Sequence, residues 1–179
     1  MRTLIIFLRA VNVTGKNLLP MALLQKELAL LGYEQVKTYI QSGNILLKTS
    51  QDREEVKIAV EAMIKDKFSL AISSFVLEQE ELKKAMENNP FDASLPGNRV
   101  FLTFISPQPT DEDLAQSKLV PIGAEEFHLI DKVVYFYLPD GMARSVLNNA
   151  FFEKKWNVQA TGRNWNTIQK MNELIHANN

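Results

Sequence analysis

Hydrophobic and polar positions along the chain alternate between the patterns of buried strands and of amphipathic helices. Residues 3–9 are almost continuously apolar, which predicts a buried strand. A polar loop follows as far as Leu18. The apolar spacing over 19–31 then predicts a helix that starts near Pro20, where a missing N–H costs little, and ends at Gly32.

The same reasoning completes a first α/β unit. Gly43 marks a tight connection between two strands, and Asp52 with Glu55 has the spacing of a capping box at a helix start. The two strands are predicted over Gln35–Ile40 and Asn44–Lys48 and the helix over 52–66. A last strand is predicted over Ala71–Leu77. The order β-α-β-β-α-β is that of a ferredoxin-like motif, in which the first strand is expected to be internal because it is apolar on both faces.

The pattern restarts after a polar helix, Glu78–Glu87, and a loop rich in Asn, Pro and Gly. A strand is predicted over Arg99–Ile105 and a short helix over Thr110–Ser117. A hairpin follows, with strands Glu126–Ile130 and Lys132–Leu138. The next helix is predicted from Asp140 onward, and its apolar positions are Val146, Leu147, Ala150 and Phe151. A final helix is predicted from about Arg163. Its buried face should carry Trp165, Ile168, Met171 and Ile175.

We therefore predict an α+β fold of two ferredoxin-like (βαββαβ-type) halves with antiparallel sheets and a C-terminal helix. The predicted boundaries are 1–77 for the first half, 78–98 for a connecting helix and loop, and 99–179 for the second half. The second half is expected to end in a helix where the first ends in a strand. The halves share element order and no obvious sequence identity.

Composition narrows the classes of partner. The chain has 179 residues, 46% of them hydrophobic, and 20 Lys and Arg against 21 Asp and Glu leave a formal charge of −1. Such a balance does not favour binding to nucleic acid or to anionic membranes. No segment approaches the roughly 18 apolar residues that a membrane span needs. Without any cysteine, disulfides and thiolate sites are excluded, and a cytoplasmic location is expected.

The first polar cluster lies in the loop after the first strand and contains Arg9, Asn12, Lys16 and Asn17. Gly15-Lys16 resembles part of a phosphate loop, but the earlier glycine is missing and Asn17 replaces the hydroxyl residue that binds Mg²⁺. Long polar loops often bind ligands. The alternative is that Asn12 and Asn17 satisfy backbone groups while Lys16 is only solvated.

The second polar cluster is the connection between the next two strands and contains Tyr39, Gln41, Ser42 and Asn44. Ser42 and Asn44 are residues that an ordinary turn requires. Alternation places Tyr39 and Gln41 on one face, where they are candidate ligand contacts. Tyr39 is equally compatible with a core position in which its hydroxyl is hydrogen-bonded.

The third polar cluster, with Arg163 and Asn164, is predicted at the start of the last helix, with Thr161 as its N-cap or next to it. A cation there opposes the helix dipole. Either a carboxylate pairs with Arg163, or the arginine and the helix amides await an anion.

No catalytic motif is present. The chain lacks a G-x-S-x-G elbow and an H-E-x-x-H pair, and its two histidines, His128 and His176, are far apart. An RNA reader of the four-stranded type would need aromatic residues on its central strands, and Ile45-Leu46-Leu47 has none. No catalytic residue, cofactor or metal ligand is predicted, and whether the protein is an enzyme stays open.

The three clusters together resemble the bacterial domain-of-unknown-function 1697 (DUF1697) family, through residues 8–17, 38–44 and 163–167. Asn89-Pro90-Phe91 and the strand that follows are also similar, so the resemblance covers essentially the whole chain. It implies paired ferredoxin-like halves and no established reaction. Two positions depart from the family, which usually has glycine at Ala10 and Thr14.

Two functions from different classes fit these observations. The first is binding of a small phosphorylated or carboxylated ligand, for which Arg9, Lys16, Gln41 and Arg163 would line one pocket and Arg163 would contribute little to stability. The second is a non-catalytic interaction or scaffold protein whose polar motifs are structural. The edge strands of its open sheets would then favour self-association into a homo-oligomer.

Overall fold

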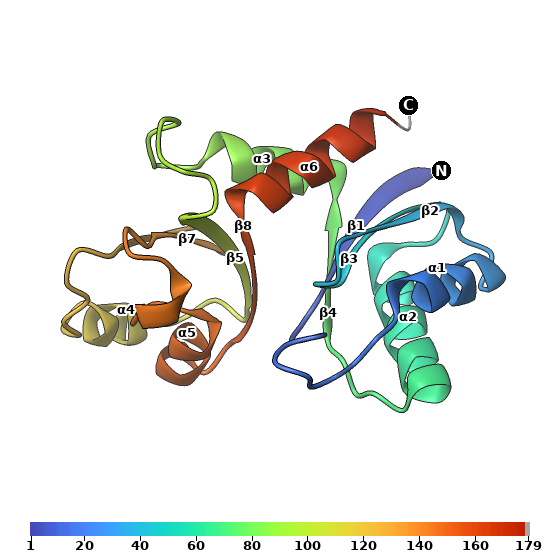
Figure 1. Ribbon diagram of the computed structural model, residues 1–179, viewed down its shortest axis with the longest axis horizontal. Helices are drawn as coiled ribbons and strands as arrows, with labels where there is room; N and C mark the ends of the chain where they lie inside the picture. The colour runs from blue at the N-terminus through green and yellow to red at the C-terminus, as the bar shows by residue number, and fades with distance from the viewer. Residues whose placement is uncertain (178–179) are drawn as a thin grey trace. The chain divides into compact units, whose positions relative to one another are not determined.

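The computed structural model describes residues 1–177, which contain two four-stranded antiparallel sheets (Figure 1). The last two residues of the predicted second half, 178–179, lie outside the described residues. The chain divides into two units, one formed by Met1–Lys84 with the segment that begins at Lys170, the other by Ala85–Gln169. The predicted α+β class with two ferredoxin-like halves is confirmed.

The first sheet has the order β2-β3-β1-β4, and every neighbouring pair is antiparallel. Its strands are β1 (Arg2–Leu8), β2 (Glu34–Tyr39), β3 (Asn44–Thr49) and β4 (Ser74–Glu78). β1 is internal, and Leu4 through Leu8 are fully buried, as expected for a strand that is apolar on both faces.

Helices α1 (Met21–Leu30) and α2 (Arg53–Phe68) pack on one face of this sheet (Figure 1). Leu4, Ile6 and Leu8 meet apolar residues of both helices in one core. Asp52 and Glu55 form the predicted capping box, which satisfies backbone donors that would otherwise be orphaned at the helix start. Helix α3 (Gln79–Glu87) follows β4 directly.

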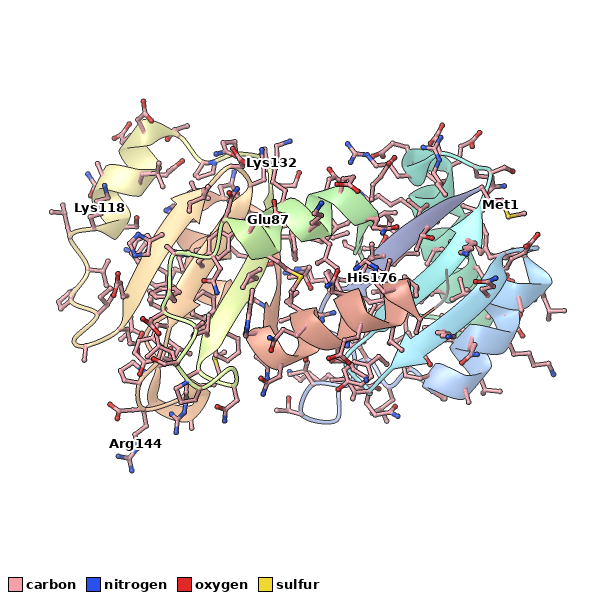
Figure 2. The ribbon with its side chains drawn as sticks, turned by 90° about the horizontal axis from the view of Figure 1, so that it is seen from above. Met1, Glu87, Lys118, Lys132, Arg144 and His176 are labelled. Carbon is pink, nitrogen blue, oxygen red and sulfur yellow. The ribbon has the colours of Figure 1, made fainter. Side chains whose placement is uncertain are left out.

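The second sheet has the order β6-β7-β5-β8, the same arrangement as the first. Figure 2 shows the side chains of the described residues on the ribbon. Its strands are β5 (Val100–Ser106), β6 (Glu126–Ile130), β7 (Val133–Tyr137) and β8 (Gln159–Asn164), and its helices are α4 (Asp111–Ser117) and α5 (Asn149–Trp156). Aromatic rings fill the core between sheet and helices, with Phe152 at 5.6 Å from Phe136 and 4.8 Å from Trp156 between ring centroids.

One strand of the second half was not predicted. Residues 159–164 form β8, which pairs with β5 from Phe101 to Ser106, and α6 (Trp165–His176) begins only after it. The prediction that Arg163 stands at a helix start, with Thr161 as the N-cap or next to it, is therefore wrong, because both residues lie within β8. Every residue from Phe101 to Ser106 has a partner in this ladder, so strand pairing outweighs the helix-start signal of the local sequence. Each half is a complete βαββαβ unit followed by a helix.

The helix expected from Asp140 also begins later. Gly141 has φ +81°, a short 3₁₀ turn follows at Met142–Arg144, and α5 is capped by Asn148, whose Oδ1 accepts from Phe151 N–H at 2.9 Å. The later start shifts the buried face of the helix. Leu147 is buried, whereas Val146 is 40% exposed, and the α5 side chains in the core are those of Phe152 and Trp156.

The closing helix differs from its prediction at one position. Ile168, Met171 and Ile175 are fully buried as expected, but Trp165, the first residue of α6, is only half-buried. The tryptophan of the second core is Trp156, whose Nε1 donates to Asp113 O at 3.2 Å. A helix start one residue after the strand places Trp165 at the edge of the buried stripe.

Candidate functional site

The first loop, residues 9–20, carries a two-residue turn at its tip. Val13 and Lys16 pair as an isolated bridge, and Lys16 N–H donates to Val13 O at 2.9 Å. Between them Thr14 and Gly15 have φ of 47° and 76°, the positive values that a type I′ turn requires at both central positions. The loop therefore presents Thr14, Gly15 and Lys16 at an ordered, exposed tip.

Asparagine side chains hold this loop in place. Asn12 Oδ1 accepts from Leu19 N–H at 2.8 Å, while its Nδ2 donates to Leu19 O at 3.0 Å and to Gln41 O at 2.7 Å. Asn17 Nδ2 donates to Ala10 O at 2.8 Å. The bonds of Asn12 join the first loop to the connection between β2 and β3, and both asparagines bind backbone groups, as the structural alternative for these residues describes.

A glycine allows the two connections to lie against each other. Leu8 N–H donates to Gly43 O at 2.8 Å, and a Cβ at Gly43 would lie 2.7 Å from both Leu8 Cβ and Val11 Cγ2. Such an approach is open only to glycine. We call residues 9–19 and 40–43 together the turn pair.

Asn44 is fully buried beneath the turn pair and organises the β2–β3 connection. Its Nδ2 donates to Tyr39 O at 3.0 Å and to Ser42 Oγ at 2.9 Å. Tyr39 is half-buried and lies near Lys170 of α6, whose pKa is raised chiefly by its 2.9 Å ion pair with Glu173 and slightly by Tyr39. Asn44 is thus a framework residue, and Tyr39 lies at the border of the turn pair.

The electrostatic character of the turn pair is positive. Residues 9–19 and 38–46 contain no aspartate or glutamate, whereas Arg9 and Lys16 are cationic. Lys16 and Gln41 are exposed and Arg9 is half-buried. In the described part of the chain, no carboxylate lies within ion-pairing distance of Lys16.

Arg163 and Asn164 belong to the other unit. Arg163 is 8% exposed, and its Nη1 donates to Thr161 Oγ1 at 3.0 Å and to Gly162 O at 2.8 Å. Burial lowers the pKa of its guanidinium to about 10 because a charge held away from water is disfavoured. Asn164 caps α6 by accepting from Thr167 N–H at 3.0 Å. That these residues share one pocket with Arg9, Lys16 and Gln41 stays a prediction.

Two residues of the first loop have a backbone conformation that glycine adopts more easily. Ala10 and Thr14 have φ of 53° and 47°, a region that costs side chains with a Cβ roughly 1–2 kcal/mol, most of all a β-branched one. Replacing either residue by glycine should raise the free energy of unfolding by about 0.5–1 kcal/mol, after the larger entropy loss of glycine is subtracted. Urea denaturation measures this change. The control Ala22→Gly, at an exposed α1 position, should lower it by about 1 kcal/mol. A loss of stability in both loop variants would contradict the described turn.

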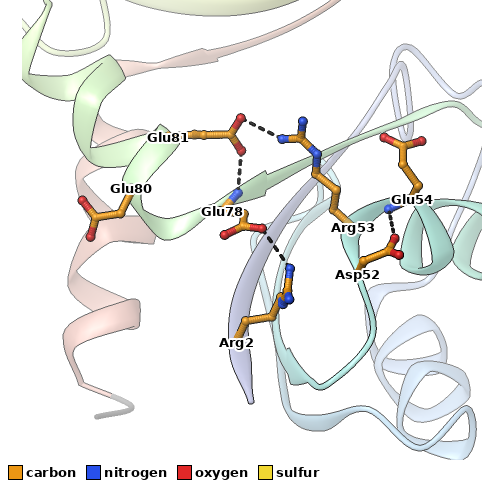
Figure 3. Close-up of a pocket in the computed structure, with 7 residues that line it drawn as sticks. All are labelled: Arg2, Asp52, Arg53, Glu54, Glu78, Glu80 and Glu81. Atoms are coloured by element: carbon orange, nitrogen blue, oxygen red, sulfur yellow. Dashed lines mark hydrogen bonds and ion pairs between the residues drawn. The ribbon is translucent and has the colours of Figure 1, made fainter.

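A hollow in the first unit was not predicted from the sequence. Its volume is about 570 Å³, and its lining comprises Arg2, Asp52, Arg53, Glu54, Glu78, Glu80 and Glu81 (Figure 3). Arg2 pairs with Glu78 at 3.1 Å and Arg53 with Glu81 at 2.8 Å. The carboxylates outnumber the cations, so this hollow is acidic. The acidic run Glu78–Glu81 is its only sequence signal, and an acidic helix start is too common to distinguish it.

Residues 1–177 lack the features of two other kinds of protein, metal-binding and membrane-spanning. These residues contain no group of three or more His, Cys, Asp or Glu side chains that could hold a metal ion. Among them, no helix combines the length and the apolar character needed to cross a membrane.

Comparisons with known proteins place the chain beside proteins without assigned function. The family model described as "Protein of unknown function (DUF1697)" matches residues 1–135. No curated protein matches the chain. Among solved structures, a conserved bacterial protein from Streptococcus pneumoniae is similar with a TM-score of 0.75 and 21% sequence identity, over 96% of this chain and 97% of that one. At this identity the likeness concerns the fold.

Proposed function

The chain belongs to the DUF1697 family, whose members are described as proteins of unknown function, and we propose that its turn pair binds a small molecule through a phosphate or carboxylate group. The observation that carries this proposal is the charge pattern. Arg9 and Lys16 both lie on the first loop, and neither this loop nor the β2–β3 connection joined to it contains an acidic residue. An oxyanion is the kind of group that cations in a segment without carboxylates attract.

Preorganisation supports the same proposal. The hydrogen bonds of Asn12 and Asn44 hold the turn pair in one conformation before any ligand arrives, so little entropy is lost on binding. Thr14 and Gly15 offer main-chain N–H groups at the tip, next to Lys16. Backbone amides in turns with positive φ form concavities that suit anions. The exposed Gln41 adds a side-chain amide.

The role of Arg163 in this function is narrower than the sequence suggested. Its guanidinium is buried in the second unit and bonded to Thr161 and Gly162. The proposed site therefore rests on Arg9, Lys16 and Gln41. No residue is assigned as a catalytic acid or base, and the proposal is one of binding.

A second function, an interaction with another protein, is favoured by a different feature of the same surface. Val13 is 52% exposed, Leu18 67% and Ile40 49%, all on the turn pair. Exposed apolar side chains next to cations and amides are typical of an interface. Under this alternative the partner is a protein with an acidic and apolar surface, or a second copy of the chain.

A ligand screen with matched variants tests the first function. The full chain is screened by thermal shift against phosphorylated metabolites, nucleotides and organic acids. A ligand at 100 times its dissociation constant should stabilise it by about 2.7 kcal/mol. Lys16→Ala should weaken such binding about tenfold, because it removes a charged hydrogen-bond donor. Lys26→Ala, which removes an exposed lysine of α1, should leave it unchanged.

The outcomes separate the two functions. If no anionic ligand stabilises the protein, or if Lys16→Ala and Lys26→Ala behave alike, the binding proposal fails. Size-exclusion chromatography with light scattering then tests the alternative. Replacing Val13 and Ile40 by serine should shift an oligomer of the chain toward monomer if these side chains form the interface.

A further inference from the structure

The two halves can be compared position by position through their sheet registers. Leu4 of β1 pairs with Glu78 of β4, and Phe101 of β5 pairs with Asn164 of β8. Leu4 and Phe101 both face the helices of their own half. Leu4 is therefore equivalent to Phe101, and Glu78 to Asn164. Two residues earlier on the same face, the equivalent positions are Arg2 and Arg99.

In the first half this arginine has a carboxylate partner. Arg2 Nη1 lies 3.1 Å from Glu78 Oε1, across the strand pair at the mouth of the acidic hollow (Figure 3). A diagonal contact of this kind is within reach of a long side chain. The second half has Asn164 at the position of Glu78 and Thr167 at the position of Glu81. Neither is charged, and Asn164 Oδ1 instead accepts from Thr167 N–H.

Arg99 is left with a guanidinium that no protein acceptor satisfies. Among residues 1–177, its Nη1 is a buried polar atom without any hydrogen-bond partner, and no carboxylate lies within ion-pairing distance of the side chain. An orphaned buried donor is rare in folded proteins and indicates a missing acceptor. The residue as a whole is half-buried.

Two glycines make room for this arrangement. A Cβ at Gly141 would lie 2.5 Å from Arg99 Nη1 and 3.3 Å from its Cζ, so the guanidinium rests directly on the glycine backbone. A Cβ at Gly97 would overlap Asn166 Oδ1. The guanidinium is thereby held in one place, and the amide of Asn166 is fixed against the segment that leads to Arg99.

We propose that Arg99 forms an oxyanion subsite in the second half, at the position equivalent to the acidic hollow of the first half. A carboxylate or phosphate group would take the place of the missing Glu78 carboxylate, with its oxygens on the planar fork of the guanidinium, a geometry that arginine favours. The subsite contains no residue of the turn pair and does not depend on the function proposed for it.

The test is an NMR titration of the full chain with two probes, sodium phosphate and sodium acetate, each against sodium chloride at equal ionic strength. The guanidinium Nε–H resonance of Arg99 should shift saturably with at least one probe. Arg99→Gln should weaken that binding about tenfold or more, through loss of a charged pair. Arg2→Gln, the equivalent change in the first half, should leave it unchanged. A response to phosphate alone assigns a phosphoryl group, and a response to acetate alone assigns a carboxylate.

If Arg99→Gln does not fold, a second variant tests whether Arg99 binds the two probes. Asn164→Glu restores the carboxylate of the first half beside Arg99, and this internal partner should compete with both probes and weaken their binding about tenfold. The proposal is overturned if neither probe shifts Arg99 beyond the chloride control. It is equally overturned if a folded Arg99→Gln variant, or Asn164→Glu in its absence, binds within about twofold of the unmodified chain.

Discussion

Replacing Trp156 by alanine is expected to lower the free energy of unfolding by about 3–5 kcal/mol, as for other large aromatic residues removed from a core. Trp156 is 2% exposed and lies against Phe152 and Phe127, with ring centroids 4.8 Å and 6.1 Å away. Its Nε1 also donates to Asp113 O. Alanine therefore leaves a cavity, loses the aromatic contacts and leaves a carbonyl without its donor.

The matched control is Trp165→Ala in the same unit. Trp165 is half-buried, so part of the cavity would open to water and the loss should be about 1–2 kcal/mol. Guanidinium chloride denaturation followed by circular dichroism measures both variants. Equal losses, or a loss under about 1 kcal/mol for Trp156→Ala, would contradict the assignment of the core tryptophan.

The two tryptophans show where sequence patterns succeed and where they fail. β1 and α1 were predicted within a few residues because a long apolar run and a sustained helical stripe are strong local signals. The second half has weaker signals. Asp140-Gly141 has the residues of both a turn and a helix cap, and only tertiary contacts select Asn148 as the cap of α5. The buried face of α5 shifts accordingly, toward Trp156.

β8 was missed for a related reason. Thr161-Gly162-Arg163-Asn164 is polar and precedes a clear helical stripe, so it has the composition of a helix start. Its backbone groups pair with β5, and Gly162 lies where a Cβ would meet Thr103 Oγ1 at 2.5 Å and Asn149 Oδ1 at 2.7 Å. This close approach across the sheet explains the glycine, and no local pattern contains that information.

For the candidate site, sequence composition identified the segments but not what each residue does. The first loop and the β2–β3 connection meet, as the ferredoxin-like order implies for connections beside neighbouring strands. Which amide binds backbone depends on distances of a few ångströms, so the framework role of Asn12 could be stated only as an alternative. The acidic hollow and the unpaired Arg99 arise from packing between segments far apart in the chain, which a single sequence does not distinguish from ordinary surface charges.

Arg163 is the residue for which the structure changes the expected result most. An arginine that mainly serves a ligand could be removed with a loss within about 1 kcal/mol. The observed side chain is buried among protein groups, and we now expect Arg163→Ala to be less stable than Arg163→Met by about 2–4 kcal/mol, because methionine fills the space that alanine leaves empty. Arg163→Met should lie within about 1 kcal/mol of the unmodified chain, since it loses hydrogen bonds but also removes the cost of a buried charge.

The pH dependence of the free energy of unfolding distinguishes the cost of the buried Arg163 charge from the effect of side-chain packing. Burial lowers the pKa of Arg163 to about 10, well below its ordinary value, so the folded state holds the proton less strongly than the unfolded state. The resulting cost is fully present below pH 10 and is relieved as the pH rises above about 10. Between pH 8 and pH 11 the unmodified chain should therefore gain about 1 kcal/mol of stability relative to Arg163→Met, measured by urea denaturation at both values. A stability difference that does not change with pH, together with equal stabilities of the alanine and methionine variants, would mean that the guanidinium is solvated and available to a ligand after all.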